Sequence, residues 1–284
     1  MLPKDTGEAH YVDLHIHTKH SDGISSVDEV LEAALAQGLQ AISITDHDTV
    51  DAYPAAMERA AALGIELIPG VEVSCNLGQT DIHVLGYCMD TENRALREKL
   101  QEMKDARFVR ARRMVEKLNA QGIDLRFETV LKVAGSAAMG RPHIAAAMMQ
   151  EELIYSVRDA FERLIGYDSP AYVEKMQIAP SEVFQLIIQA GGVPVLAHPA
   201  LTRVDEHIPQ FVRDGLMGIE VMHAEPAPAV ERFYRELCGK HGLLMTGGSD
   251  YHSPAQSGRV VIGWPRVPAA FVQMLKGERA SLVT

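Results

Sequence analysis

The chain has 284 residues, of which 47% are hydrophobic, and a formal net charge of -11 at pH 7. This size and composition suit one large α/β domain with room for an inserted subdomain, and they exclude a disordered chain. The negative charge argues against duplex nucleic acid as a partner. No apolar run approaches the roughly 18 residues of a membrane span, and residues 1–8 lack the apolar core of a leader. We therefore expect a cytoplasmic protein without a membrane partner.

The first third of the chain alternates apolar runs typical of strands with amphipathic runs typical of helices. A strand is expected over 11–15, and a helix follows from Ser26, which has the spacing of a capping box with Glu29. Gly38 is expected to end this helix. The next expected elements are a strand (41–45), a helix (51–62) and two strands (66–69 and 82–86). The strand-helix-strand order favours parallel pairing.

A long segment without a strand pattern follows the fourth expected strand. Residues 91–121 have the spacing of a long amphipathic helix, and 127–133, 143–153 and 156–164 resemble shorter helices. We therefore expect a mostly helical insertion over residues 93–175. Beyond it the strand pattern returns. A helix capped by Ser181 precedes strands expected at 193–197, 218–222 and 243–246, the first of them despite Pro194.

Seven strands separated by helices fit either a closed barrel or an open, doubly wound sheet. Functional side chains of a (β/α) barrel gather at the carboxyl ends of many strands, whereas an open sheet uses one switch point. Histidines and carboxylates follow several of the expected strands here, which favours a TIM-like (β/α)7 barrel. Residues 1–92 and 176–284 would form this barrel, and the 93–175 insertion would contribute to the substrate pocket.

Two of the polar clusters have the same spacing at opposite ends of the chain. His15 and His17 lie two residues apart after the first strand, so both side chains point to the same side of an extended chain. Asp250 and His252 repeat this spacing after the last strand. Either pair could present two ligand atoms to one metal ion, although a single such pair is also compatible with ordinary surface histidines.

The clusters between these pairs have similar alternatives. His47, between Asp46 and Asp48, is a candidate ligand, and its two neighbours could orient an imidazole or, for Asp48, cap the next helix. Glu72 lies between two valines, where a carboxylate could bridge two cations or face water at a strand edge. His83 has the same ambiguity.

Two further candidates complete the set. Asp22 precedes Gly23 and could be a turn residue, and His198 ends a strand that Pro199 prevents from continuing. Because so many histidines and acids follow successive strands, we interpret them together as a site for several divalent cations. This predicts a metallohydrolase.

These residues resemble the PHP (polymerase and histidinol phosphatase) family of metal-dependent phosphoesterases. The resemblance covers residues 11–90 and 180–255 and rests on motifs in family order: HIH (15–17), SDG (21–23), TDHD (45–48), GVE (70–72), His83, AHP (197–199) and SDYH (249–252). It implies a distorted (β/α)7 barrel with three metal ions, usually manganese, iron or zinc. The implied ligand sets are His15, His17, Glu72 and Asp250 for one ion, Glu72, His83 and His198 for a second, and Asp22, His47 and His252 for a third, with Glu72 bridging the first two.

The insertion resembles PHP enzymes that hydrolyse nucleoside 3′,5′-bisphosphates and trim short RNAs from the 5′ end. The segment that carries this resemblance is Gly140-Arg141-Pro142-His143-Ile144-Ala145-Ala146. It implies that Arg141 and His143 contact substrate, a guanidinium being able to take two phosphate oxygens at once. The alternatives are a loop arginine and a histidine at a helix start. The lysine that many such relatives carry shortly before Tyr172-Val173 is absent here.

We therefore expect a metal-dependent phosphoesterase, containing two to three ions of Mn, Fe or Zn, that acts on a small nucleotide or short RNA. A water bridging two cations would attack phosphorus in line. His198 would be a ligand or the proton donor to the leaving group, and His223 an ordinary loop residue. The alternatives are a phosphatase for a non-nucleotide metabolite such as histidinol phosphate, a non-catalytic metal-binding module, and an amidohydrolase. Two-metal amidohydrolases typically use a bridging barrel lysine, which the seven expected strands lack.

Overall fold

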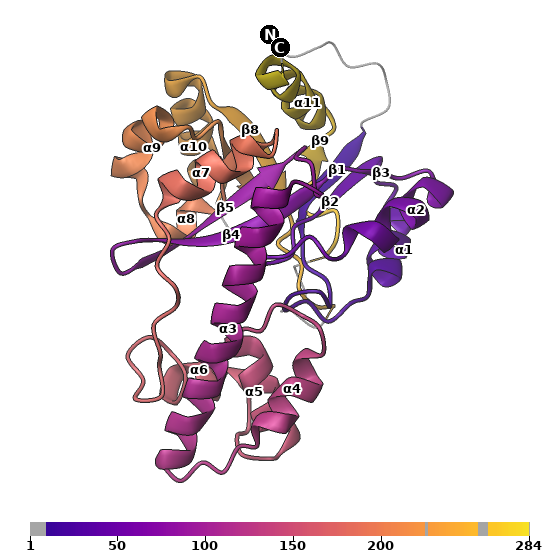
Figure 1. Cartoon of the computed structure of the whole chain (residues 1–284). Coiled ribbons are helices and arrows are strands. Elements are labelled where there is room, and N and C mark those ends of the chain that lie inside the picture. Colours follow the sequence, from indigo (N-terminus) through magenta and orange to yellow (C-terminus); the bar gives the residue numbers. More distant parts are fainter. Residues whose placement is uncertain (1–9, 225–226, 255–260, 284) are drawn as a thin grey trace.

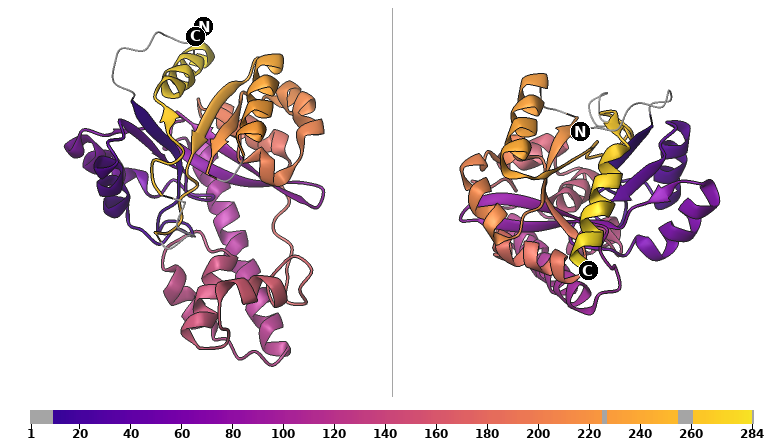
Figure 2. Two further views of the ribbon diagram at one scale, coloured as in Figure 1. Left: turned by 180° about the vertical axis from the view of Figure 1, so that it is seen from behind. Right: turned by 90° about the horizontal axis from the view of Figure 1, so that it is seen from above.

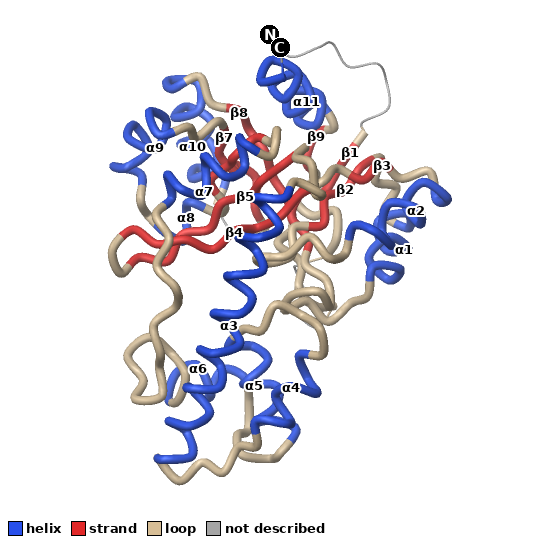
Figure 3. The backbone as a smooth tube through the Cα atoms, in the orientation of Figure 1, coloured by secondary structure: helices blue, strands red, loops and turns tan. Residues whose placement is uncertain are grey.

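The computed structural model describes residues 10–224, 227–254 and 261–283, so residues 1–8, where no leader is expected, lie outside it. Strands occupy the interior of a main body, from which a lobe of helices projects (Figures 1 and 3). The helices α1 (Val27–Ala36) and α2 (Tyr53–Leu63) lie on one side of the strands, and α7 (Pro180–Gln189) to α10 (Pro228–His241) on the other (Figure 2). The predicted α/β class is confirmed.

The first sheet has the strand order β3-β2-β1-β9. The strands β1 (Tyr11–Ile16), β2 (Ala41–Ile44) and β3 (Glu66–Leu67) pair in parallel, and β9 (Val267–Pro268) pairs antiparallel to β1. Every residue of β2 and all but the first of β1 are buried, as in parallel strands covered on both faces. Among their apolar residues, β1 also buries Asp13 and His15, and β2 buries Ser43.

The second sheet has the order β4-β5-β6-β7-β8 and corrects part of the sequence-based topology. A strand over Gly70–Leu77 (β4) was not expected; it forms a hairpin with β5 (Thr80–Tyr87) around Gly78, which has a φ of 60°. No helix intervenes, so the pairing is antiparallel. β5 also pairs antiparallel to β6 (Val193–Leu196), whereas β6, β7 (Gly218–His223) and β8 (Leu244–Gly248) are parallel. Pro194 lies within β6, opposite Gly86.

The two sheets meet at the ends of their strands. Single bridges join Ile16 to Tyr251 and His47 to Glu72, and the backbone N–H of His17 donates to the carbonyl of Tyr251 at 2.9 Å. These bridges lie at the carboxyl ends of β1 and β2. The named strands are otherwise paired within two separate sheets, so a closed (β/α)7 barrel is not confirmed in the described part of the chain.

The projecting lobe is helical, as expected for the middle of the chain. It consists of α3 (Arg94–Ala120), α4 (Phe127–Ala134), α5 (Arg141–Gln150) and α6 (Val157–Arg163). Apolar side chains of α4, α5 and the second half of α3 form a core separate from that of the main body, whereas Leu96, Leu100 and Met103 at the start of α3 pack on the main core. α3 thus anchors the lobe to the strands. Among the described helices, not one combines the length and apolar character that crossing a membrane requires.

The remaining helices complete the main body. They are α8 (Pro199–Thr202), a 3-10 turn (Asp205–His207), α9 (Ile208–Asp214) and α11 (Ala270–Val283). The predicted capping box at the start of α1 is confirmed, since the Ser26 hydroxyl accepts from the Glu29 N–H and the Glu29 carboxylate accepts from the Ser26 N–H.

Candidate metal centre

The nine ligands predicted from sequence meet at the junction of the two sheets. They come from strands or from the loops after them: His15 lies within β1; His17, Asp22 and His47 follow β1 and β2; Glu72 and His83 lie on the hairpin; His198, Asp250 and His252 follow β6 and β8. Ligand atoms of eight of them form three overlapping groups, in each of which all atoms lie within 4.8 Å of one another, and His198 is outside these groups. Gly248 allows this convergence, because a Cβ there would lie 2.4 Å from the Cβ of His15.

The first group contains His15, His17, Glu72 and Asp250, which is the set implied by the family resemblance. The Nε2 atoms of both histidines face the same two oxygens. For His15 the distances to Glu72 Oε2 and Asp250 Oδ1 are both 3.3 Å, and for His17 they are 3.1 and 3.2 Å. Two imidazole nitrogens and two carboxylate oxygens thus surround one point.

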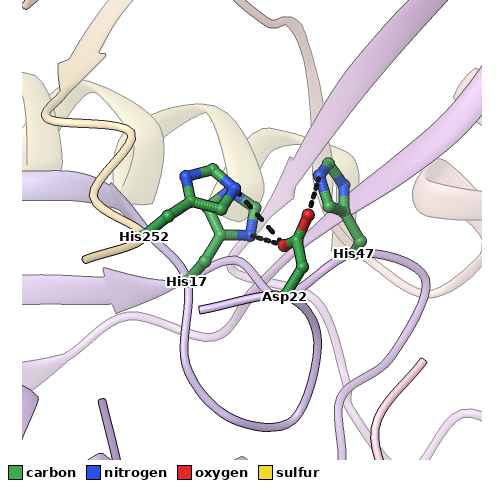
Figure 4. A group of neighbouring side chains, drawn as sticks. All are labelled: His17, Asp22, His47 and His252. Atoms are coloured by element: carbon green, nitrogen blue, oxygen red, sulfur yellow. Dashed lines mark ion pairs between the residues drawn. The ribbon is translucent and has the colours of Figure 1, made fainter. Parts of the chain in front are cut away.

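The second group contains His17, Asp22, His47 and His252 (Figure 4). Asp22 lies at its centre, with Oδ1 3.3 Å from His252 Nε2 and 3.9 Å from His17 Nδ1, and with Oδ2 3.9 Å from His47 Nε2. His17 belongs to this group as well as to the first, because its two ring nitrogens face different carboxylates. The turn-residue alternative for Asp22 therefore does not account for its position.

The third group contains His47, Glu72 and His83, and His198 lies beside it. His83 Nδ1 and His198 Nε2 approach Glu72 Oε1 at 2.9 and 3.0 Å, while His47 Nδ1 approaches Oε2 at 3.1 Å. His47 therefore lies between the second and third groups. This differs from the implied assignment, in which His47 contributes to one ion only.

The chemistry of these atoms suits metal ions. Four buried ligand atoms of the groups have no hydrogen-bond partner among the described residues, namely Asp22 Oδ1, His47 Nδ1, Glu72 Oε2 and Asp250 Oδ1. Buried polar atoms are normally satisfied, and leaving one without a partner is costly. Imidazole and carboxylate donors suit Zn²⁺, Fe and Mn. The donor set therefore fits divalent metal ions.

Without ions, histidinium and carboxylate groups neutralise one another. Burial alone would raise the pKa values of Asp22 and Glu72, but the imidazoles around them lower both well below the usual range. Burial would likewise lower the pKa of His252, but Asp22 and Asp250 raise it to about 10. His47 differs: burial, with contributions from His17 and His83, lowers its pKa to about 3, so it is neutral and able to ligate at pH 7.

The backbone around the centre is unusual in three places. His198, Asp48 and Asp250 have φ values of 28°, 52° and 53°. Residues other than glycine rarely adopt such values, and they cluster at functional sites where the surrounding structure enforces them. Asp48 does not cap a helix or orient an imidazole as proposed from sequence. It accepts from the Ser74 N–H at 2.7 Å and from Arg107 Nε at 2.6 Å.

Asp46 has a supporting role of a different kind from the one predicted. Its carboxylate accepts from the Thr18 hydroxyl and the Ser21 hydroxyl, both at 2.6 Å, and from the Thr18 N–H at 2.7 Å. It therefore holds the loop after β1, in which Asp22 lies, rather than contacting an imidazole directly.

Sequence reasoning missed two polar residues next to the centre. Glu220 on β7 is 1% exposed and lies 2.9 Å from His15 Nδ1. His223, at the end of β7 and expected to be an ordinary loop residue, has Nε2 3.3 Å from Asp250 Oδ2. Glu220 alternates with apolar Ile219 and Val221 in an otherwise ordinary strand sequence. A carboxylate at the inward position of an apolar strand is the signal that could have identified it.

The two predicted substrate contacts lie at the start of α5. The His143 side chain is buried, its Nδ1 accepts from the Gly140 N–H at 3.0 Å, and burial lowers its pKa. The loop before α5 contacts the loop after β1, where the Ala138 N–H donates to the His20 carbonyl at 2.9 Å. The Arg141 guanidinium instead lies over the Tyr167 ring, 4.4 Å from its centroid.

The chain was compared with known proteins. The PHP domain profile matches residues 13–189, more than half of the chain. The chain is 30% identical over 256 residues to a 3′,5′-nucleoside bisphosphate phosphatase of Chromobacterium violaceum, covering 88% of this chain and 90% of the relative. It is 30% identical over 260 residues to the 5′-3′ exoribonuclease Rnm of Salmonella typhimurium, covering 88% of both. It is 29% identical over 262 residues to a phosphoribosyl 1,2-cyclic phosphate 1,2-diphosphodiesterase of Eggerthella lenta, covering 90% of this chain and 99% of the relative.

The fold agrees with these matches. A solved structure from Bifidobacterium adolescentis, assigned as a metal-dependent phosphoesterase, superposes with a TM-score of 0.86 at 30% identity and covers 94% of this chain and 96% of that one. All three relatives carry the names of enzymes that hydrolyse phosphate esters. The profile match, the near full-length relatives and the shared fold agree: this chain belongs to the PHP domain family of phosphoesterases.

Proposed function

We propose that this hydrolase removes a phosphate from a small nucleotide, a nucleoside 3′,5′-bisphosphate in particular, and also acts on the 5′ end of short RNA. The observation that carries the proposal is the set of three overlapping ligand groups, together with two arginines, Arg110 and Arg141, that form no ion pair among the described residues. The intact ligand set and the enzymatic relatives disfavour a non-catalytic module.

The nine residues of the centre would hold two or three ions of Mn, Fe or Zn, with Glu72 shared between groups. When bound, these ions supply Lewis acidity and lower the pKa of water. His198 would act as a ligand, because its Nε2 points at Glu72 as the His83 ring does. The proton-donor role for His198 is the less favoured assignment for the same reason.

A second phosphate would bind on the lobe side of the centre. Arg110 of α3 and Arg141 of α5 lie over the Tyr172 ring, 5.3 and 5.8 Å from its centroid. Burial, and the proximity of Arg141, lower the pKa of Arg110. Arg110 donates to the carbonyl of Val173. Arg141 donates to the carbonyl of Ile165 and to the Tyr167 hydroxyl, and neither arginine has an ion pair within the described ranges. Asp81 acts on the pKa of Arg110 without forming an ion pair with it, so the two neighbouring guanidinium groups suit an anion with several oxygens.

A further cation lies next to a candidate ligand. Lys175 forms an ion pair with Asp81, whose Oδ1 is 3.6 Å from His83 Nε2. Lys175 follows Tyr172-Val173, whereas the lysine of many family members precedes them. Lys175 therefore places a positive charge close to the centre, although the lysine that precedes these two residues in many family members is absent here.

A screen for released inorganic phosphate and, from RNA, for released mononucleotide tests the proposal. The panel should contain a nucleoside 3′,5′-bisphosphate, the matching 3′- and 5′-monophosphates, 5′-phosphorylated short RNA, a duplex and histidinol phosphate, each with Mn²⁺, Fe²⁺ or Zn²⁺. We expect the bisphosphate to have the highest kcat/KM and the duplex to be inactive. A preference for histidinol phosphate over all nucleotides would contradict the substrate class. Absence of release with every metal would contradict the function.

A variant pair tests the second phosphate site. Arg141→Met should raise KM for the bisphosphate by about 10- to 100-fold, the range for one lost charge-assisted contact of about 1.5–3 kcal/mol, and leave KM for the monophosphates nearly unchanged. The control is Arg158→Met, in the same lobe but exposed and paired with Glu162. Equal effects of Arg141→Met on both substrate types would contradict the assignment.

A further inference from the structure

Glu220 lies beneath the metal centre without belonging to any of the three ligand groups. It is 1% exposed and comes from β7. Its two carboxylate oxygens have different partners: Oε1 lies 2.9 Å from Nδ1 of His15, and Oε2 accepts from the backbone N–H of His198 at 2.8 Å. One carboxylate therefore contacts two candidate ligands that are far apart in sequence.

The contact with His15 determines which ring nitrogen is available to a metal. A carboxylate accepts hydrogen bonds only, so Nδ1 of His15 must carry the proton in this pair. When the His15 ring is neutral, Nε2 is then the nitrogen that offers a lone pair to a metal, and it points at Glu72 Oε2 and Asp250 Oδ1. Metal-binding histidines commonly have such a partner on the second nitrogen, which raises ligand basicity and fixes the ring.

The contact with His198 acts on the backbone. His198 has a φ of 28° and ψ of 56°, a sparsely populated conformation, and it is followed by Pro199. The bond to Glu220 is formed by the N–H of this strained residue and therefore holds the turn that aims the His198 ring at Glu72.

We propose that Glu220 is a positioning residue for metal binding, which fixes the ring orientation and proton position of His15 and the backbone turn of His198. This inference rests on the proposed metal-dependent function. Removal of the Glu220 carboxylate should weaken metal binding by about 10- to 100-fold, as observed for partners of metal ligands in general.

Glu220→Gln is the most informative variant, because glutamine keeps the size and shape of glutamate but replaces one acceptor oxygen with a donor NH₂ group. The His198 N–H can only donate, so the glutamine oxygen should face it and the glutamine NH₂ should face His15 Nδ1. His15 must then accept at Nδ1, which places its proton on Nε2, the nitrogen required for the metal. The control is Glu236→Gln, an exposed glutamate on α10.

The experiment combines Zn²⁺ titration of the ion-free proteins by calorimetry with ¹⁵N NMR of labelled histidines in the Zn²⁺-loaded state, the His15 signals being identified by their loss in His15→Gln. We expect wild type and Glu236→Gln to bind Zn²⁺ alike, with the His15 proton on Nδ1. Glu220→Gln should bind about 10- to 100-fold more weakly. Circular dichroism checks that each variant is folded.

The remaining outcomes contradict either the inference alone or the inference together with the proposed function. A wild type that binds no Zn²⁺ contradicts the proposed function and this inference together. A wild type that binds Zn²⁺ with the His15 proton on Nε2 contradicts the inference alone, and this result does not depend on any Glu220 variant folding. A folded Glu220→Gln with wild-type affinity also contradicts the inference alone.

Discussion

Glu72 is the single residue on which the candidate centre depends most. Its Oε2 faces His15, His17 and His47, and its Oε1 faces His83 and His198, all within 3.3 Å. The residue is 1% exposed, so water does not screen these interactions. The negative charge of a carboxylate buried in this way must be neutralised, either by histidinium ions or by metal ions.

Glu72→Gln should therefore abolish most of the metal binding and activity. Glutamine keeps one acceptor oxygen and replaces the other with an NH₂ group, which faces imidazole nitrogens required as ligands. We expect a loss of metal affinity above about 100-fold, more than the effect of residues that only contact a ligand. Metal content after dialysis and phosphate release check this, with Glu236→Gln as control. Wild-type metal content in a folded Glu72→Gln would contradict the central role of Glu72.

The raised pKa values of the histidines predict how stability depends on pH. The pKa of His252 is about 10 in the ion-free fold, and that of His15 is well above the ordinary 6.5 because Glu220, Asp250 and Glu72 outweigh its burial. A group whose pKa rises on folding stabilises the fold fully below its unfolded pKa and loses this effect as pH rises through the folded pKa. The ion-free protein should thus lose stability from about pH 6.5 to about pH 10.

Thermal unfolding with a chelator and with Zn²⁺ measures this effect. The melting temperature of the ion-free protein should fall across that range, and the Zn²⁺-loaded protein should change less, because its coordinated imidazoles are already neutral. Zn²⁺ affinity should rise over the lower part of the range, since the imidazoles must lose protons to bind. Parallel melting curves with and without Zn²⁺ would show that these histidines are not the cause.

At the scale of elements, α3 connects the lobe to the loop that carries His47. Arg107 of α3 pairs with Asp48, at 2.6 Å from Nε, and with the Ser74 hydroxyl at 2.9 Å. Asp48 is 1% exposed and directly follows His47. This buried pair therefore joins the helical lobe, the ligand loop after β2 and the hairpin strand β4.

Arg107→Met should destabilise the protein strongly, because it leaves the Asp48 carboxylate buried without a counter-charge. Breaking a buried pair by removing one partner typically costs about 3–5 kcal/mol. Urea unfolding measures the loss. Arg97→Met on the same helix, where Arg97 pairs with Glu92 at the surface, should cost less than about 1 kcal/mol. Similar costs for both variants would show that the Arg107 pair does not hold these elements together.

At the scale of the whole molecule, the main body and the lobe have separate apolar cores. The nine candidate ligands all belong to the main body, whereas Arg110 and Arg141 belong to the lobe. Metal binding and recognition of a second phosphate should therefore be separable. The boundaries of the insertion, 93–175, remain a prediction from sequence.

Ile144→Ala tests the separation. Ile144 is 1% exposed in the core of the lobe, and truncation of such a residue typically costs about 2–5 kcal/mol. We expect an unchanged Zn²⁺ content and a raised KM for the bisphosphate, because the lobe loosens while the strands retain their packing. Met149→Ala, at an exposed position of the same helix, is the control. Loss of Zn²⁺ from Ile144→Ala would show that the lobe and the centre are coupled.

The identities of the candidate ligands were predicted from sequence, because imidazole and carboxylate chemistry is local and HxH and DxH spacings place both side chains on one side of an extended chain. Their places after strands were predicted only in part, since Glu72 and His83 lie within β4 and β5. Only the tertiary structure decided what depends on distant segments: the hairpin in place of parallel strands, His47 between two groups rather than in one, Arg141 over Tyr167, and Glu220 beneath His15. Each of these depends on which strands become neighbours. Strand pairing is set by packing of the entire core, which short motifs do not encode.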